Sequence, residues 1–346
     1  MKKTFRQTNQ TRNRGGLTIV ELLVCIGIAS FLMALLLPAV QSARASARRI
    51  ECVNRLKQII TATQAFEATH RHFPGYSTAR GIDYHGRIHW NVCPLVEILP
   101  YLEQSNVFDQ IDRNRWIGSF DAYGSGQLLS GMNAEFAKLT IPVYQCPSDH
   151  NLPGSGNYRI NLGTGADWYT RPPAPPSNSC FDPNNGNGAF ATMETLTTGK
   201  FTDGLSNTVF YSERVIGDGD STQFSPWRDY SQVTQGWVSC SASDLQSTCQ
   251  GIAGIATKHA SFAGHTWLFP SKAHTAYDHI LPPNSRIPDC ARDGSALPSA
   301  GNSAISARSQ HAEIVNAALG DGSVRSVSEN IDQTVWHKLG SRNGHD

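Results

Sequence analysis

The chain has 346 residues, 39% of them hydrophobic and 16% charged, a length that predicts about two domains at roughly 150 residues each. The apolar share is large enough to bury a core, which excludes a chain that is disordered throughout. With 29 basic and 28 acidic residues, the formal net charge is +1. That balance excludes a basic protein that coats nucleic acid and an acidic tail protein, so no nucleic-acid partner is expected.

Charge is unevenly distributed along the chain. Residues 1–16 carry five basic residues and no acidic one, which leaves 24 basic against 28 acidic residues in the remainder. Basic residues that precede a membrane segment tend to stay in the cytoplasm. We therefore expect the two ends of the chain to lie in different compartments.

Residues 17–37 form a 21-residue apolar run with a single charge, Glu21. A helix of this length, rising about 1.5 Å per residue, spans the hydrocarbon core of a bilayer. An ordinary secretory signal has an apolar run of about 7–15 residues with a small-x-small cleavage site after it. Here the nearest such triplet, residues 45–47, comes eight residues after the run ends. A plain signal anchor stays open, but it does not explain the carboxylate, which costs roughly 2.5–3.5 kcal/mol in hydrocarbon.

The residues around Glu21 resemble the class III signal of type IV prepilins and type II secretion pseudopilins. Gly16 precedes Leu17, Glu21 is the fifth residue after Gly16, and Pro38 is the twenty-second. The resemblance implies that a prepilin peptidase cleaves between Gly16 and Leu17 and methylates the new N-terminus. Pilins of this family also carry a proline at the position of Pro38, whereas Leu17 departs from the commoner phenylalanine.

Cleavage at this place creates an ammonium group at Leu17, and Glu21 of a neighbouring subunit is expected to neutralise it. A buried ion pair adds little net stability, but it can specify the stagger between otherwise featureless helices. Pro38 removes a backbone donor and clashes with the carbonyl of Ala34, so a kink or a local break in the helix is expected there.

Residues 38–72 are predicted to continue the helix as an amphipathic segment, which Pro74-Gly75 ends. Apolar side chains recur at steps of three and four residues, a pattern typical of a helix that packs one face against a globular head. These side chains are Val40, Ala43, Ala47, Ile50, Val53, Leu56, Ile60, Thr63 and Phe66.

Residues 73–346 are predicted to form this head outside the membrane, with residues 170–188 as a surface loop. Strands are expected at 208–213 and 236–239, and a hairpin at 313–328 turns at Asp321-Gly322. A last helix is predicted to begin at an N-cap Asn330 with Gln333 completing the cap. The fold expected is therefore α+β, with a long N-terminal helix packed on a mainly antiparallel β head with long loops.

Five further segments extend the resemblance over nearly the whole chain. They look like a large bacterial family of pilin-like proteins, named for its prepilin-type cleavage domain and its C-terminal H-x9-DG segment, whose head is a domain of unknown function. The resemblance implies membrane attachment and filament-type assembly, and it supplies no catalytic residues. The segments are residues 49–58, 99–103, 146–149, 203–207, and His311 with Asp321-Gly322.

Eight cysteines in a chain that lies largely outside the cytosol favour disulfides. Cys25 lies in the apolar run, which leaves seven others, so at least one stays free or pairs between chains. The local loop Cys240–Cys249 is the first predicted disulfide, and Cys52–Cys146 is the second. There is no C-x-x-C pair, so neither a zinc knuckle nor a thioredoxin-like site is predicted.

Neither an enzyme nor a resident metal or cofactor is expected. The 12 histidines form no H-E-x-x-H pattern, and no G-x-S-x-G elbow occurs. His311 and Asp321 are interpreted as elements of the hairpin and not as an acid–base pair. Calcium stays open through the oxygens of Asp218, Asp220 and Asp321, although no loop matches an EF-hand.

The leading hypothesis is a pseudopilin-like structural subunit of a type II secretion or type IV pilus-like system. Its expected partners are prepilin peptidase and other pilin-like subunits, of its own kind or another. It is expected in the bacterial inner membrane as a single-pass protein, with the N-terminus cytoplasmic and the head extracytoplasmic. The alternative is a monomeric membrane-anchored extracytoplasmic binding protein, which the large, tryptophan-containing head keeps open.

Overall fold

The computed structural model describes residues 18–76, 79–82, 88–90, 93–113, 119–120, 128–130, 134–164, 186–191, 194–233, 242–252, 259–292 and 303–344. The chain divides into two units, Met1–Ala47 and Arg48–Asp346. Several predictions fall outside the described residues: those for Gly16, Leu17 and Cys240, the strand at 236–239, and most of the loop at 170–188.

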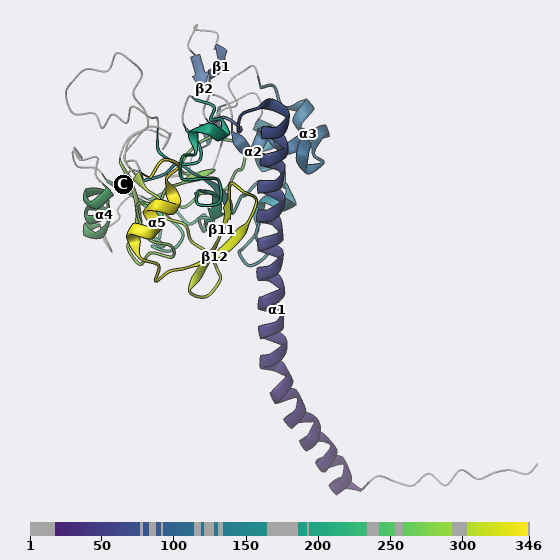
Figure 1. Ribbon diagram of the computed structural model, residues 1–346. Coiled ribbons are helices and arrows are strands. Elements are labelled where there is room, and N and C mark those ends of the chain that lie inside the picture. Colours follow the sequence, from purple (N-terminus) through teal and green to yellow (C-terminus); the bar gives the residue numbers. More distant parts are fainter. Residues whose placement is uncertain are drawn as a thin grey trace, which may run out of the picture. The chain divides into compact units, whose positions relative to one another are not determined.

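The elements alternate between short helices and short strands after one long helix (Figure 1). The helices are α1 (Ile19–His70), α2 (Pro94–Glu97), α3 (Ser105–Gln110), α4 (Ala242–Gly251) and α5 (Gln333–Gly340), with 3₁₀ turns η1 (Leu99–Leu102), η2 (Ala134–Lys138), η3 (Pro142–Tyr144) and η4 (Thr198–Lys200). The strands are β1 (Ala79–Ile82), β2 (Ile88–Trp90), β3 (Ser119–Phe120), β4 (Leu128–Ser130), β5 (Tyr158–Asn161), β6 (Val209–Glu213), β7 (Tyr230–Val233), β8 (Ala276–Tyr277), β9 (Asp289–Arg292), β10 (Ser303–Ala304), β11 (Ile314–Leu319) and β12 (Val324–Ser328).

A reciprocal cap opens α1 in the first unit. The backbone N–H and the hydroxyl of Thr18 donate to Glu21 Oε2 over 2.9 and 3.0 Å, and the N–H of Glu21 donates to Thr18 Oγ1 over 3.3 Å. This is a capping box, whose Thr-x-x-Glu signature stands in the sequence. The carboxylate of Glu21 therefore has a local partner within its own helix. Further along, α1 runs through Pro38 without interruption, so the local break considered from the sequence does not occur.

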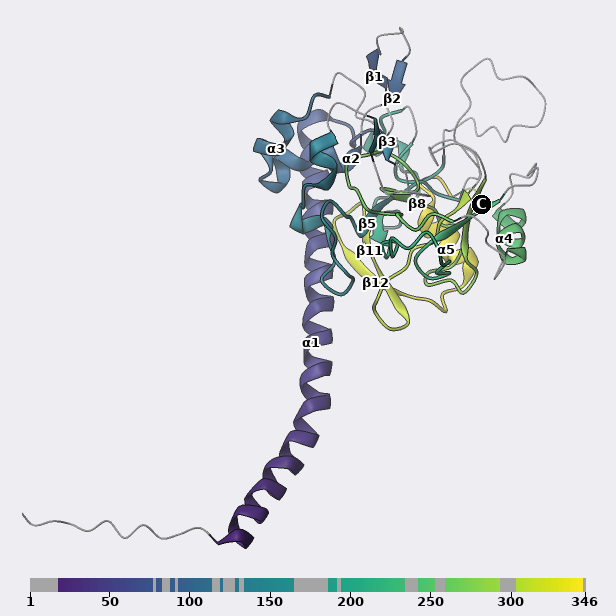
Figure 2. The same cartoon turned by 180° about the vertical axis from the view of Figure 1, so that it is seen from behind.

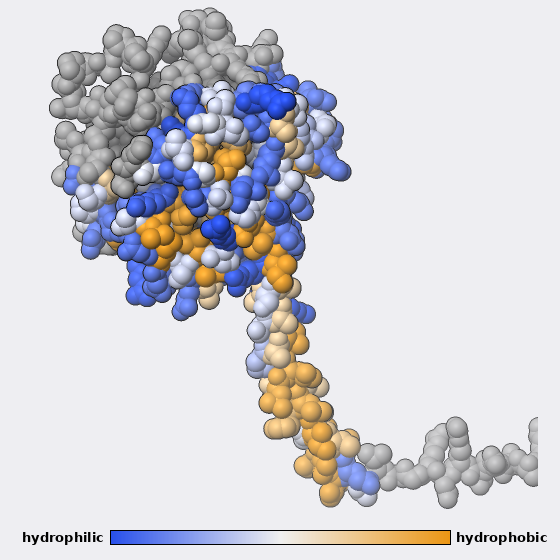
Figure 3. All heavy atoms as spheres, viewed as in Figure 1, coloured by the Kyte–Doolittle hydropathy of each residue, from blue (hydrophilic) through white to orange (hydrophobic). Residues whose placement is uncertain are grey.

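The apolar part of α1 is uncovered in the first unit. Residues 18–50 are all exposed, and an 18-residue window of α1 has a mean hydropathy of 2.6 with none of it buried. Hydrophobic residues follow one another along this part of the helix (Figure 3). By length and composition the helix can cross a membrane, a test that a signal sequence near the N-terminus also passes.

In the second unit, α1 buries one stripe against the head, as predicted, but the stripe is turned from the predicted position. Ile50 is 61% exposed and Val53 is only half-buried, whereas Cys52 and Ile59 are fully buried. Steps of three and four back from the buried Phe66 lead to Leu56 and then to either Val53 or Cys52, and in the structure it is Cys52 that faces the head. The stripe consists of Cys52, Leu56, Ile59, Ile60, Ala62, Thr63 and Phe66.

The sheets of the head are mixed and mainly antiparallel. The largest has the strand order β12-β11-β6-β5-β8, and a smaller one has the order β10-β9-β7. In each of these two sheets one pair is parallel, β5 with β8 and β7 with β9, and the other pairs are antiparallel. The α+β class and the C-terminal hairpin, β11 with β12, agree with the predictions.

The hairpin lies along the head-packed part of α1, and both views show the two elements side by side (Figures 1 and 2). Lys57 Nζ donates to the carbonyl of Gly322 over 2.6 Å, and Gln64 Nε2 donates to the carbonyl of Gly320 over 3.0 Å. Gly322 has a φ of +86°, and a Cβ there would lie 2.8 Å from Gln64 Oε1. The backbone conformation of the turn therefore favours glycine, and a larger residue would also push the end of the Gln64 side chain aside.

The last helix, α5, begins two residues later than predicted, because Asp332 and not Asn330 is its N-cap. Asp332 Oδ1 accepts from the backbone N–H groups of Thr334 and Val335 over 2.9 and 3.1 Å. The N–H of Asn330 donates to Ser328 Oγ instead. Residue 330 thus belongs to the turn that follows β12.

Replacing this cap gives a direct test of the helix start. Asp332→Ala should lower the free energy of unfolding of the head by about 1 kcal/mol, because two orphan N–H groups lose their acceptor. Asn330→Ala is the matched control and should cost much less. Denaturant unfolding of the full chain in detergent measures both. A larger loss for Asn330→Ala than for Asp332→Ala would place the cap at residue 330 instead.

Candidate functional site

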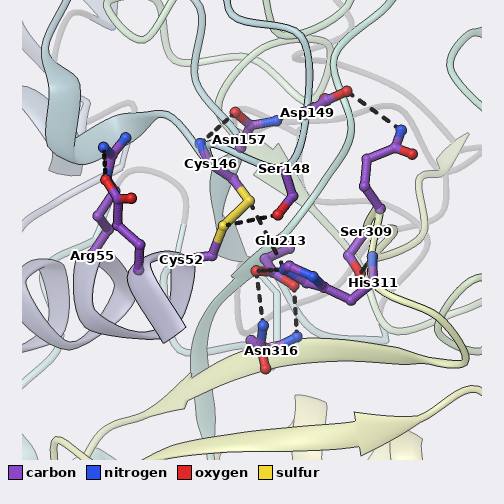
Figure 4. The surroundings of a disulfide bond; sticks show 12 residues. Cys52, Arg55, Cys146, Ser148, Asp149, Asn157, Glu213, Ser309, His311 and Asn316 are labelled. Carbon is purple, nitrogen blue, oxygen red and sulfur yellow. Dashed lines mark hydrogen bonds and ion pairs between the residues drawn. A yellow bond between two sulfur atoms is a disulfide. The ribbon is translucent and has the colours of Figure 1, made fainter. Parts of the chain in front are cut away.

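Four buried side chains from separate segments meet beside α1. They are Cys52 of α1, Cys146 after η3, Glu213 at the end of β6 and His311 before β11, and their sulfur, oxygen and nitrogen atoms lie within 4.8 Å of one another (Figure 4). Three of the four lie in segments that carry the family resemblance described above. The meeting of these segments makes this cluster the candidate site.

A disulfide joins Cys52 to Cys146, with their Cα atoms 5.1 Å apart and 94 positions between them in the sequence. This bond is the second of the two pairings predicted. The backbone is fixed on both sides of it: Tyr158 Oη donates to the carbonyl of Cys52 over 3.1 Å, and the N–H of Cys146 donates to Asn157 Oδ1 over 2.8 Å. The bond is thus held between α1 and strand β5.

Arg55, one turn after Cys52 on α1, secures the segment that leads to Cys146. Its Nη1 donates to the carbonyls of Pro142 and Gln145 over 2.7 and 2.6 Å. A guanidinium can make such paired contacts because its donors form a rigid fork. Helix α1 is therefore joined to the segment before Cys146 by a covalent bond and by two charge-assisted hydrogen bonds.

The first predicted disulfide, Cys240–Cys249, is wrong, because Cys249 is bonded to Cys290. The Cα atoms of this pair are 5.4 Å apart and the residues are separated by 41 positions. Cys249 lies on the inner face of α4, fully buried in a small core cluster with Cys290. Proximity along the chain favoured Cys240, but the face that α4 buries decides the partner. Among the described cysteines, Cys25 and Cys93 are free.

His311 and Glu213 form a buried pair next to the disulfide. His311 Nε2 lies 3.3 Å from Glu213 Oε1, with the two side chains 6% and 2% exposed, and 3.9 Å from Cys146 Sγ. Asn316 on β11 holds the carboxylate with its backbone N–H on Oε2 at 2.8 Å and its Nδ2 on Oε1 at 3.0 Å. Ser309 Oγ accepts the backbone N–H of His311 over 3.0 Å. Asn316 therefore orients the carboxylate, and Ser309 fixes the backbone that carries the imidazole.

Asn157 links the disulfide to a second buried carboxylate, Asp149. The Nδ2 of Asn157 donates to Asp149 Oδ2 over 2.9 Å, and Arg228 Nη1 donates to Asp149 Oδ1 over 2.9 Å. Burial by itself raises the pKa of Asp149, but the hydrogen bonds from His150 and from the N–H of Ile216, together with the charge of Arg228, outweigh it and lower this pKa to about 2. Asp149 is therefore an anion in the folded head at neutral pH.

The carboxylates proposed for calcium are used in their own turns. Asp218 Oδ1 accepts from the N–H of Asp220, whose own Oδ1 accepts from the N–H and the hydroxyl of Thr222. Asp321 Oδ1 accepts from the N–H and the hydroxyl of Ser323. Asp321 thus shapes the hairpin turn, as interpreted from the sequence, and the acid that His311 meets is Glu213.

Sequence reasoning missed the role of Glu213 and a second buried ionic cluster. Arg214 and Arg308 both bind Asp289, over 2.9 and 3.0 Å, and all three side chains are 0–1% exposed. Burial raises the pKa of Asp289, but the two guanidinium charges dominate and keep it below its ordinary value. The residues come from three distant segments, and no spacing in the sequence marks them as partners.

Because the pKa of Asp149 is lowered, the free energy of unfolding of the head depends on pH in the acidic range. The unfolded chain titrates near the ordinary value of 3.8 and the folded chain near 2, so the stabilisation is complete above about pH 4 and is lost as the pH falls toward 2. Asp149→Asn should therefore cost about 2 kcal/mol more at pH 6 than at pH 2. Unfolding free energies of wild type and variant at several pH values measure this.

The exposed Asp109 on α3 offers the matched control. The difference between wild type and Asp109→Asn should stay nearly constant over the same pH range, because a solvated carboxylate gains little on folding. A constant difference for Asp149→Asn as well would show that Asp149 is not held as an anion.

The similarity of this chain to known proteins lies mainly in the head. A family model described as "Protein of unknown function (DUF1559)" matches residues 41–334. Searches of curated proteins and of solved structures give no significant match. The matched segment covers all four residues of the candidate site and begins after the apolar part of α1. The chain belongs to the DUF1559 family of proteins of unknown function.

Proposed function

We propose that this chain is a pseudopilin-like structural subunit that prepilin peptidase processes and that assembles through its N-terminal helix with copies of itself or other pilin-like subunits. The observation that carries the proposal is the apolar first part of α1, which is uncovered from Ile19 to Leu37 and carries one carboxylate. Soluble monomers rarely expose apolar surface beyond a few hundred Å². A bilayer covers this helix before assembly, and neighbouring helices cover it afterwards.

Charge and cysteine chemistry support the direction of insertion. The five basic residues in segment 1–16 favour a cytoplasmic N-terminus under the positive-inside rule. Two disulfides among the described cysteines of the head favour an oxidising compartment for it. The proposed location is therefore the inner membrane, with the head on the outer side.

The capping box gives Glu21 a second role that the proposal must accommodate. Within one chain, the carboxylate satisfies donors of Thr18 at the start of α1. Cleavage after Gly16 would put an ammonium group one residue before this cap. In a bundle of apolar helices, that charge needs a carboxylate, and Glu21 is the acid in the span.

A structural role fits the head as well, and we propose no catalytic activity. The sulfurs of Cys52 and Cys146 are consumed in a bond, and Glu213 is fixed by Asn316. In this state the candidate site fastens α1 to the sheet of the head. Such fastening suits a subunit that has to keep one shape in an assembly.

The second candidate is a monomeric, membrane-anchored binding protein. The matching family model bears the name SBP_bac_10, which hints at a binding-protein-like role. However, Trp267, one of the tryptophans that favoured a ligand-binding head, is fully buried, and so is Trp336 of α5. Their indole N–H groups donate to the carbonyls of Leu139 and Leu281 over 2.7 and 2.9 Å, so they serve the core.

Processing is tested on the mature protein. We expect its N-terminal sequence to begin at Leu17, with a methylated amine, because the peptidase of this class cuts after the glycine. Mass spectrometry of the protein from a membrane fraction measures this. A start at Arg48, after Ala47, would instead indicate ordinary signal peptidase and contradict membrane anchoring through α1.

The role of Glu21 is tested with three variants that separate charge from capping. Glu21→Gln keeps a capping acceptor without the charge, Thr18→Ala removes the cap but keeps the charge, and Glu21→Ala removes both. Both Glu21 variants should lose about 3–5 kcal/mol per subunit on assembly, which lowers incorporation at least a hundredfold. Thr18→Ala should assemble nearly normally. Crosslinking between membrane helices, scored on correctly cleaved chains only, measures incorporation.

The pattern among the variants decides between the readings. If Glu21→Gln assembles as well as wild type, Glu21 acts as a cap and not as a counter-ion. If wild-type chains never crosslink in intact cells, the structural-subunit proposal fails and the binding-protein candidate gains.

A further inference from the structure

We propose that Cys52, Cys146, Glu213 and His311 form a binding site for Zn²⁺, or for a similar borderline divalent cation, when the disulfide between the two cysteines is reduced. Two thiolates, one imidazole and one carboxylate are a ligand set that suits this ion. The set is assembled from four elements that the fold already brings together, and it is buried.

The distances fit a four-coordinate ion. Bonds of about 2.3 Å to sulfur and about 2.0–2.2 Å to nitrogen and oxygen place tetrahedral ligand atoms about 3.3–3.8 Å from one another. His311 Nε2 is 3.3 Å from Glu213 Oε1 and 3.9 Å from Cys146 Sγ. All four ligand atoms lie within 4.8 Å of one another. Reduction breaks the bond between the two sulfurs, so that each can take a coordination distance of its own.

The carboxylate ligand is oriented as metal ligands usually are, and the backbone that carries the imidazole is fixed. Glu213 receives two hydrogen bonds from Asn316, 2.8 and 3.0 Å long, which leave Oε1 directed at His311. The hydroxyl of Ser309 accepts the backbone N–H of His311. Outer partners of this kind fix the first ligands and commonly alter metal affinity by about 10–100-fold.

The disulfide between Cys52 and Cys146 and the bound cation exclude each other, because both need the same two sulfurs. A dithiol reductant gives two electrons and two protons to the disulfide, which becomes two thiols while the reductant becomes a disulfide. The cation then binds both sulfurs as thiolates and releases two protons to solvent. A disulfide oxidant reverses the sequence: it accepts two electrons from the two thiolates and takes up two protons from solvent as it becomes a dithiol, the bond between Cys52 and Cys146 forms again, and the cation leaves. The site is therefore open to metal only in a reduced head.

The second disulfide of the head provides an internal control. In the described part of the chain, the Cys52 cluster is the one place where three or more potential metal ligands lie within 4.8 Å of one another. Cys249 and Cys290 have no such neighbours there. Reduction frees two sulfurs at each disulfide, but only the sulfurs of Cys52 and Cys146 have an imidazole and a carboxylate beside them.

The test uses the full chain in detergent micelles, as an oxidised pool and a pool reduced with a phosphine, titrated with Co²⁺. We expect the reduced pool alone to bind one ion per chain with a thiolate-to-cobalt charge-transfer band and the d–d bands of a tetrahedral ion, and Zn²⁺ to displace it. His311→Ala and Glu213→Gln should each weaken binding at least tenfold. The double variant Cys249→Ser with Cys290→Ser should bind as wild type does.

Circular dichroism and melting of the reduced pool, with and without Zn²⁺, accompany the titration. If the reduced chain loses structure, Zn²⁺ should restore it in wild type and not in His311→Ala. The proposal is overturned if a folded reduced chain gives no tetrahedral band. Equal bands in His311→Ala, or a reduced chain that stays unfolded with Zn²⁺, overturn it as well.

Discussion

The bond between Cys52 and Cys146 is the constraint on which the architecture of the head depends. It closes a loop of about a hundred residues, which in the chain-entropy view removes on the order of 4–5 kcal/mol of freedom from the unfolded state. Around it, Tyr158 and Arg55 hold the two backbones in place. The rest of the contact between α1 and the head follows from this point: once Cys52 faces inward, Leu56, Ile59, Thr63 and Phe66 must face inward too.

The same point organises the sheet. Glu213 ends β6 beside the disulfide and binds Asn316 of β11, so the polar cluster joins the neighbouring strands in addition to their backbone hydrogen bonds. Asn316 Oδ1 in turn accepts from Ser326 on β12, whose hydroxyl oxygen accepts from Arg49 on α1. The bonds between Glu213 and Asn316 are buried, so losing one of these two partners is costly. Ser326 and Arg49 are exposed and extend the network to the surface of the hairpin and of α1.

Much of the fold could be predicted because its signals are local. The apolar run, the helix that ends before Pro74-Gly75, β6 and the hairpin around Asp321-Gly322 depend on periodicity and turn chemistry within a few residues. The face of α1 was misplaced because the sequence does not say whether Cys52 or Val53 points inward. The partner of Cys249 was missed because contact with Cys290 depends on how α4 packs. Glu213 and His311, 98 positions apart, carry no common signal.

The capping box changes what the carboxylate of Glu21 means. A glutamate in an apolar helix invites a search for a partner in another chain, but here the first partner is Thr18, three residues away. Capping needs only a side-chain acceptor, which glutamine also provides, whereas neutralising an ammonium group in an apolar bundle needs a charge. Glutamate at this position is able to meet both demands. The local cap therefore does not compete with an assembly role: it holds the carboxylate at the start of the helix, where the ammonium group of a cleaved chain would have to be neutralised.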